Sequence, residues 1–312
     1  MSETLELNEI PQAAECYLFA GWRQWADGGS VSSGLPRYLV DQTGARPIGR
    51  LRNDDFYLFQ IPGTHDLLRP VVQFDHGFPK ELETPKNEFF YSGDEKRGLA
   101  FFIGDEPHLN VERYIEAILE AARRLKVQRI IGFGGVYGEV PFNKERTISS
   151  NYSLESLKTE MEALGVNLSE YQGGASIGSV LCKRAGEAGI EYVSFYAFVP
   201  AYDFSRLGEH GGSIRIENDF GAWLGILKRV KTMLNLELDL YELEVKNAQL
   251  VEAFEEKMQE IDKANPEMHL PEYLKRLEED FEEVSFNPSD DFWEEKLRGL
   301  FDDLEGDNAT HD

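Results

Sequence analysis

Short apolar runs alternate with longer amphipathic segments over the first three quarters of the chain. The runs at 16–20, 98–104, 129–133 and 191–199 have the length and composition of buried strands. The run at 191–199 is almost unbroken, which is typical of a central strand covered on both faces. These four segments are predicted to form the middle of a sheet.

Between the runs, apolar residues recur at helical spacing. In 110–126, Tyr114, Ile118 and Leu125 fall on one face. Further helices are predicted at 30–42, 153–164, 174–188 and 218–235, and Pro36 can shift the start of the first of these. Strand–helix–strand order implies right-handed crossovers. The pattern therefore predicts an α/β protein with three layers, in which a mostly parallel sheet lies between helices.

One segment interrupts this order. Apolar stretches flank Asp75-His76-Gly77, whose residue types favour a turn. We expect a hairpin insertion over about 70–91.

The pattern changes near residue 236. Residues 236–263 form an amphipathic segment, Pro271 suits the first turn of a second helix, and Ser289 opens a third. Their apolar stripes need a surface to pack on. We therefore predict an α/β core domain at 1–235 and a helical subdomain at 236–305; a free-standing acidic arm that recruits a partner is the alternative. Residues 306–312 are predicted to be disordered.

Charge marks the same boundary. The 312 residues carry a net charge of −25. The segment 236–312 holds 25 Asp and Glu against 7 Lys and Arg, a net of −18, which leaves −7 for the rest. Such a chain is unsuited to binding nucleic acid or anionic membranes, because both depend on basic surface. Neither is expected as a partner.

The N-terminus, the length of the apolar runs and the cysteines bear on the cellular compartment. The acidic N-terminus has no basic region of the secretory type, and no apolar run approaches the roughly 20 residues that span a bilayer. Cys16 and Cys182 lie inside apolar patterns, which favours reduced, buried thiols. A cytoplasmic protein is expected.

Glycine-rich loops follow the predicted strands. They are Gly21-Trp22-Arg23-Gln24-Trp25-Ala26-Asp27-Gly28-Gly29, Gly132–Pro141 and Val199–Asp203, and a glycine-led helix start lies at Gly173-Gly174. In open α/β proteins, ligands bind at such strand ends. These loops are the predicted site.

The loop at 132–138 does not fit a dinucleotide fingerprint. The third glycine of that motif would fall at Tyr137, and Pro141 follows where a helix should begin. We expect no cofactor. The glycines here serve either a tight turn or a ligand contact.

The stretch 173–178 is a better candidate for anion binding. Small residues at a helix start leave N–H groups exposed at the positive end of the helix dipole. Close packing of helix on sheet explains them equally well. No P-loop is present.

The ligand-binding candidates at these loops are Trp22, Asp27, Gly28, Gly134, Gly135, Glu139, Arg146, Gly173, Gly174, Ser176 and Tyr202. For the polar ones, a structural cap or salt bridge is the simpler interpretation. The six histidines show no metal-ligand spacing, so no metal is expected, and no known catalytic motif is present. No residue is assigned a catalytic role.

Six motifs in order suggest a family. They are the Gly21–Gly29 loop, Phe56–Gln60 with Arg69-Pro70, Gly104-Asp105-Glu106-Pro107, Val140–Arg146, Tyr171–Gly178, and Val199-Pro200-Ala201-Tyr202. Together, over about 15–230, they resemble the proteasome assembly chaperone family, in the second-chaperone-like branch with bacterial and archaeal members. The histidine usual after Pro141 is absent here, which weakens any acid–base role for that loop.

The resemblance implies a core like that of purine nucleoside phosphorylases and related hydrolases. It implies homo-oligomers, a trimer first, with the hairpin as an assembly element, and a C-terminal helical segment that covers the pocket. Three functions follow: a non-catalytic assembly factor with a protein client, a small-molecule-binding protein or enzyme of phosphorylase or hydrolase type under a helical lid, or a scaffold that keeps only its oligomer surface.

Overall fold

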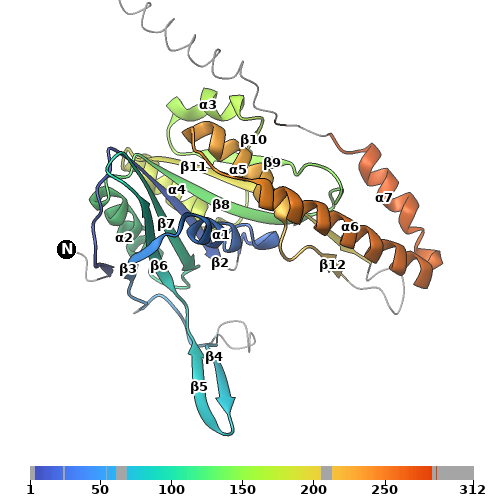
Figure 1. The fold of residues 1–312 in the computed structure, drawn as a ribbon, viewed down its shortest axis with the longest axis horizontal. Coiled ribbons are helices and arrows are strands. Elements are labelled where there is room, and N and C mark those ends of the chain that lie inside the picture. The colour runs from blue at the N-terminus through green and yellow to red at the C-terminus, as the bar shows by residue number, and fades with distance from the viewer. Residues whose placement is uncertain are drawn as a thin grey trace, which may run out of the picture.

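The fold is built around one mixed sheet. The computed structural model describes residues 4–23, 25–53, 55–60, 69–204, 213–282 and 286. Among these, ten strands form the sheet in the order β1–β3–β6–β7–β2–β8–β11–β9–β10, with β12 paired to β11 (Figure 1). Their bounds are β1 Leu5–Leu7, β2 Glu15–Arg23, β3 Arg46–Leu51, β6 Asn87–Gly93, β7 Arg97–Asp105, β8 Arg129–Gly138, β9 Ile148–Tyr152, β10 Asn167–Leu168, β11 Glu191–Asp203 and β12 Ser213–Arg215.

The four central strands β7, β2, β8 and β11 are parallel. Antiparallel strands flank them on both sides. In β2, Leu18 and Phe19 belong to different core clusters, because successive side chains point to opposite faces of a sheet. Both faces of the parallel centre are therefore buried, as its apolar runs predict.

Helices cover the two faces. Their bounds are α1 Gly34–Thr43, α2 Val111–Arg124, α3 Lys158–Ala163, α4 Ile177–Glu187, α5 Phe220–Leu234, α6 Tyr241–Ala264 and α7 Leu270–Glu279. Helices α2 and α4 share one core cluster with the sheet, and α1, α3 and α5 share the other. The predicted three-layer α/β/α fold is confirmed.

Several helices begin later than the periodicity predicts. Pro36 lies in the first turn of α1, which starts at Gly34. The stretch predicted as one helix from Ser153 is divided, with a 3₁₀ turn at Glu155–Leu157 before the short α3. Helix α4 starts at Ile177 because Ser176 caps it by accepting a hydrogen bond from Ser179 N.

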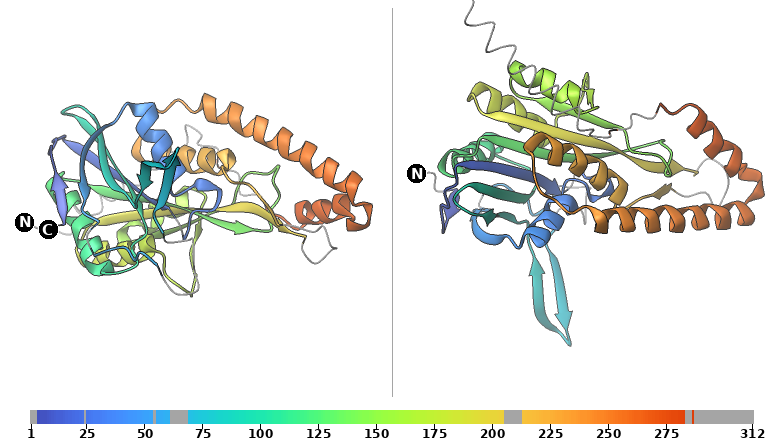
Figure 2. Two further views of the ribbon diagram at one scale, coloured as in Figure 1. Left: turned by 90° about the horizontal axis from the view of Figure 1, so that it is seen from below. Right: turned by 45° about the horizontal axis from the view of Figure 1, so that its top comes forward.

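The hairpin stands away from the body. Strands β4 Val71–Asp75 and β5 Phe78–Glu83 pair only with each other and project from the sheet (Figures 1 and 2). The remaining part of the expected insertion forms β6, which pairs with β3 and β7 in the main sheet. The free-standing part is thus 71–83.

Helices α6 and α7 follow the charge boundary. Helix α6 packs along α5, and its Leu243, Phe254 and Met258 are buried in the α1–α5 cluster. The pair extends past one end of the sheet (Figure 2). The third predicted helix and the predicted disordered tail lie outside the described residues. No helix among those described is long and apolar enough to cross a membrane.

Candidate functional site

The candidate site lies where the strand order changes direction. After β2 the chain forms β3, β6 and β7 on one side of that strand and then crosses to β8 on the other side. Ligands in open α/β sheets bind at the carboxyl ends of strands at such a point. The predicted residues gather along this edge, but they divide into three groups with different surroundings.

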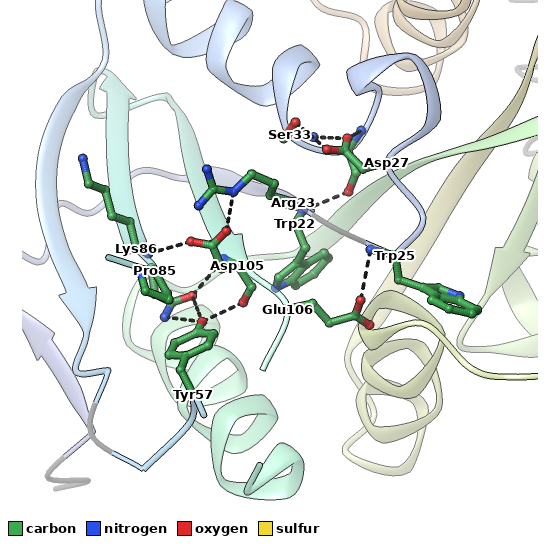
Figure 3. Close-up of polar contacts among 12 residues, drawn as sticks. Trp22, Arg23, Trp25, Asp27, Ser33, Tyr57, Pro85, Lys86, Asp105 and Glu106 are labelled. Atoms are coloured by element: carbon green, nitrogen blue, oxygen red, sulfur yellow. Dashed lines mark hydrogen bonds and ion pairs between the residues drawn. The ribbon is translucent and has the colours of Figure 1, made fainter. Parts of the chain in front are cut away.

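The first group is the Asp27 loop. The Asp27 carboxylate accepts hydrogen bonds from Ser32 N at 3.0 Å and from Ser33 N at 2.9 Å, and from the Ser33 hydroxyl at 2.7 Å (Figure 3). Burial raises the pKa of Asp27, while these hydrogen bonds oppose the rise. Its acceptor sites are used to hold the turn before α1, as the structural alternative expects.

The glycines of this group allow the loop to lie against β8. Gly135 N donates to Ala26 O at 2.9 Å. A Cβ on Gly135 would overlap the carbonyl oxygen of Gly28, and a Cβ on Gly134 would overlap the ring of Tyr196. Gly28, Gly134 and Gly135 therefore serve close backbone and side-chain approach.

The second group lies below α6 and α7. Arg146 and Asp219 form an ion pair at 2.8 Å between side chains that are 2% and 0% exposed. Asp219 also caps α5 through Ala222 N at 3.0 Å. Tyr202 is buried and donates to Val140 O at 2.8 Å. Arg146 and Tyr202 thus fix the 139–146 loop from two directions.

The helical pair covers this loop rather than the Asp27 loop. The Phe142 and Phe254 rings lie 5.0 Å apart, and Asn143 donates to Glu278 at 2.8 Å. Burial, and then the neighbouring Glu139 carboxylate, raise the pKa of Tyr273 in α7 to about 12. The expected lid therefore contacts Glu139, next to Arg146 and Tyr202.

The third group surrounds the start of α4. Trp22 and Ser176 line a narrow pocket with Trp25, Glu106 and Tyr196; its other lining residues are Ala26, Ser32, Phe133, Ile177 and Gly178. The space open to the centre of a water molecule is only about 10 Å³. Gly173 and Gly174 are exposed and do not line it, and Gly174 lies beside the Trp25 ring. The pocket holds about one water-sized group.

Glu106, which sequence reasoning did not select, occupies the anion position of α4. Its carboxylate accepts from Trp25 N at 3.3 Å (Figure 3). It also accepts from Ile177 N at 2.8 Å. Burial raises the pKa of Glu106, and these two hydrogen bonds oppose the rise. The helix N-terminus predicted to bind an anion thus already holds a carboxylate of this chain, which a free anion would have to displace.

The preceding residue, Asp105, faces the hairpin. Its buried carboxylate pairs with Arg23 at 2.6 Å and accepts from Lys86 N at 2.7 Å (Figure 3). Lys86 lies just after β5, at the root of the hairpin. Neighbouring residues along a strand point to opposite faces of the sheet. At the end of β7, the Asp105 carboxylate therefore contacts the root of the hairpin, whereas the Glu106 carboxylate lines the pocket.

A buried polar network links the two. The Trp22 indole N–H donates to the Tyr114 hydroxyl at 3.1 Å, and Tyr114 donates to Asn87 Oδ1 at 2.7 Å. The Tyr57 hydroxyl donates to Asp105 O at 2.7 Å. Trp22 is therefore held by its N–H, which leaves its ring as a wall of the pocket.

The described residues contain no cluster of three or more side chains that could hold a metal ion. Of the histidines in the described part, His108 is the one tied to this region: its Nδ1 accepts from Leu58 N at 3.1 Å, and burial lowers its pKa. Both facts favour a neutral, structural imidazole.

The sequence does hold a signal that could have identified Glu106, the motif Gly104-Asp105-Glu106-Pro107. Because β2 and β7 pair in parallel with Arg23 opposite Asp105, this motif lies at the same edge of the sheet as the loop that follows β2.

Solved structures share this fold. A proteasome-assembly chaperone homologue from Mycobacterium tuberculosis is 20% identical, with a TM-score of 0.66 over 77% of this chain and 94% of that chain. A PAC2 family protein from Streptomyces avermitilis is 22% identical, with a TM-score of 0.65 over 83% and 99%. PbaB of Pyrococcus furiosus, an archaeal proteasome activator, is 19% identical, with a TM-score of 0.57 over 82% and 99%.

No curated protein matches the chain. The model of the PAC2 family matches residues 22–261, which span all three groups of site residues. The resemblance drawn from six motifs is thereby confirmed. The chain belongs to the PAC2 family.

Proposed function

We propose that the protein is a cytosolic homo-oligomer of assembly-chaperone type, which acts by binding other proteins. The observation that carries the proposal is the free-standing hairpin β4–β5. Every residue of both strands is exposed. A two-stranded hairpin without a partner is only marginally stable in water, so one that projects from the body needs a surface to rest on.

The hairpin register sorts its side chains by polarity. Val72 pairs with Leu82, and Phe74 pairs with Pro79, so by strand alternation these four side chains share one apolar face. The bulge between Gln73 and Phe74 maintains this alignment, because it skips one residue of β5. The other face carries Gln73, Asp75, Glu81 and Glu83 with Val71 and Phe78.

An exposed apolar face of this kind is typical of a protein-binding surface. The partner proposed for it is a second copy of this chain, with a trimer first, and the client is a further protein. The Mycobacterium tuberculosis relative is described as a proteasome-assembly chaperone homologue and PbaB as a proteasome activator. Proteasome subunits are therefore the first clients to test. The buried thiols of Cys16 and Cys182 support a reducing compartment.

Support for the alternative, a small-molecule enzyme, is weaker. Among the described residues, Asp27, Arg146 and Ser176 already make structural hydrogen bonds. The pocket at α4 admits about one water-sized group, far less than a drug-sized ligand needs.

The test is the oligomeric mass by native mass spectrometry. Phe74→Glu and Leu82→Glu each place a charge on the apolar face, and Gln73→Glu places the same charge on the opposite face as a matched control. We expect a homo-oligomer for the wild type and the control, and monomers for the two face variants. A monomeric wild type, or face variants that assemble normally, would overturn the oligomer part.

The client part is tested separately, with purified proteasome subunits at several salt concentrations. Saturable binding that survives physiological salt supports it. Absence of binding to any subunit would remove the chaperone assignment, whatever the oligomeric state.

A further inference from the structure

Glu106 is an under-satisfied carboxylate. An ionised carboxylate has about four acceptor positions. Glu106 uses two, for Ile177 N and Trp25 N, both neutral donors. Among the described residues it forms no ion pair, whereas the adjacent Asp105 pairs with Arg23. A partly buried negative charge is therefore left without a cation, in a position where desolvation penalises it.

The walls around Glu106 suit a cation with an aliphatic stem. Glu106 lies between the indoles of Trp22 and Trp25 (Figure 3). Trp25 is 69% exposed, and Tyr171, in the loop before α4, is 70% exposed. An exposed indole attracts cations through its ring face and also packs against methylene groups. Trp25 lines the pocket, and the Tyr171 hydroxyl donates at 3.2 Å to the carbonyl oxygen of Gly174, which lies beside the Trp25 ring. Tryptophan and tyrosine are enriched among the residues that dominate binding at protein interfaces.

The size of the pocket selects among cations. About 10 Å³ is open to the centre of a water-sized group, close to the minimum for one water. A lysine ammonium is compact and has three donors, whereas a guanidinium is a wide planar fork. Beside the Glu106 carboxylate, Ser176 and Tyr196 line the pocket, and their hydroxyls lie 3.2 Å apart. Ser176 Oγ already accepts from Ser179 N, so when Ser176 donates to Tyr196 each hydroxyl keeps one acceptor position for a small donor.

We propose that Glu106, Trp25, Ser176 and Tyr196 form a receptor for a lysine side chain of a partner protein. The ammonium occupies the water-sized space against Glu106, and its methylene stem lies along the Trp25 indole. The proposal rests on the proposed function, since it names the chemistry by which a protein partner is recognised. The net charge of −25 favours such a basic partner.

The test uses a single-residue probe. The ¹⁵N-labelled full chain is titrated with Nα-acetyl-lysine methylamide, and the indole N–H signals are followed by NMR, with Trp25→Phe assigning the Trp25 signal. The arginine and norleucine analogues serve as matched probes of shape and charge. We expect saturable shifts at Trp25 for the lysine probe, with at least about tenfold weaker binding of the other two.

Variants separate the site from general charge. Glu106→Gln removes the charge in the pocket and should weaken binding of the lysine probe at least about tenfold. Glu170→Gln removes an exposed charge in the nearby loop and should leave binding unchanged. Trp25→Ala, at an exposed position that should not disturb folding, should also weaken binding, as followed by the backbone signals near Ile177.

Equal binding of the norleucine probe would overturn the charge argument. Equal or tighter binding of the arginine probe would overturn the size argument. Unchanged binding in Glu106→Gln would overturn the site. If proteasome subunits bind the wild type and Glu106→Gln equally, the lysine receptor fails while the proposed function stands. If the lysine probe binds but no subunit does, the lysine receptor stands while the proposed function fails.

Discussion

Removing the charge of Asp219 should destabilise the protein far more than an ordinary substitution. Asp219→Asn keeps a residue that caps helices well, so the start of α5 loses little. It leaves the Arg146 guanidinium, 2% exposed, without its counter-charge. The substitution thus isolates the charge of the pair from the cap.

The structure sets the magnitude. Breaking a buried ion pair by removing one partner costs about 3–5 kcal/mol, because the other charge stays buried. Arg146 retains hydrogen bonds to Pro141 O at 3.3 Å and Lys144 O at 2.5 Å, while its Nη2 is buried with no hydrogen-bond partner among the described residues. At about 2 °C per kcal/mol for a chain of this size, the melting temperature should fall by roughly 6–10 °C.

The assay is thermal unfolding of three variants, followed by circular dichroism. Arg146→Met alone leaves the buried Asp219 carboxylate without its counter-charge and should also lower the melting temperature. The double variant Arg146→Met/Asp219→Asn removes both charges and the unpartnered Nη2 donor, so it should recover more than half of the loss. A double variant whose loss equals the sum of the two single losses would refute the reasoning, because the pair would then have no coupling.

Two further predictions concern the same edge of the sheet. Gly135→Ala should lower the free energy of unfolding by about 1–3 kcal/mol, because the added Cβ overlaps Gly28 O. Gly138→Ala is the control and should be neutral, because its Cβ would lie 3.7 Å from Phe198. Denaturation of both variants checks this, and equal losses would contradict it. Because burial raises the pKa of Glu106 above its ordinary 4.5, the folded state holds a proton that the unfolded state releases. The stability of the wild type relative to Glu106→Gln should therefore fall as pH rises from about 4.5 through the raised pKa, and unfolding midpoints that keep a constant difference between pH 4 and pH 7 would exclude this effect.

The parallel centre of the fold could be predicted because its strands are apolar on both faces. β2, β7, β8 and β11 all carry that signature, and α2, α5 and α6 show helical periodicity close to their observed bounds. The short outer strands β3, β9 and β12 could not, because they carry fewer apolar residues and their pairing is set by segments distant in the sequence. The predicted start of α4 at residue 174 was wrong, because Ser176 caps the helix and Gly173 and Gly174 lie before that cap.

The site was only partly predictable for a related reason. Asp27 and Arg146 lie at loop ends that the sequence predicts. Whether such a group binds a ligand or a neighbouring residue depends on its partner, which is Ser33 for Asp27 and the distant Asp219 for Arg146. Glu106 was overlooked because its importance comes from α4, about 70 residues later, whose N-terminus meets it in space. Only the parallel register of β2 and β7 reveals that Asp105 and Glu106 close that edge.

The bulge in the hairpin restricts how a partner can approach. A lone two-stranded ribbon has two free edges, each a template onto which another strand could add without limit. Here the ladder is interrupted between Gln73 and Phe74, and Pro79 has no N–H to offer. Fibre-like growth along the ribbon is thereby discouraged while the apolar face stays available. A partner is therefore steered onto the flat face of the ribbon, which is the geometry that the proposed closed oligomer requires.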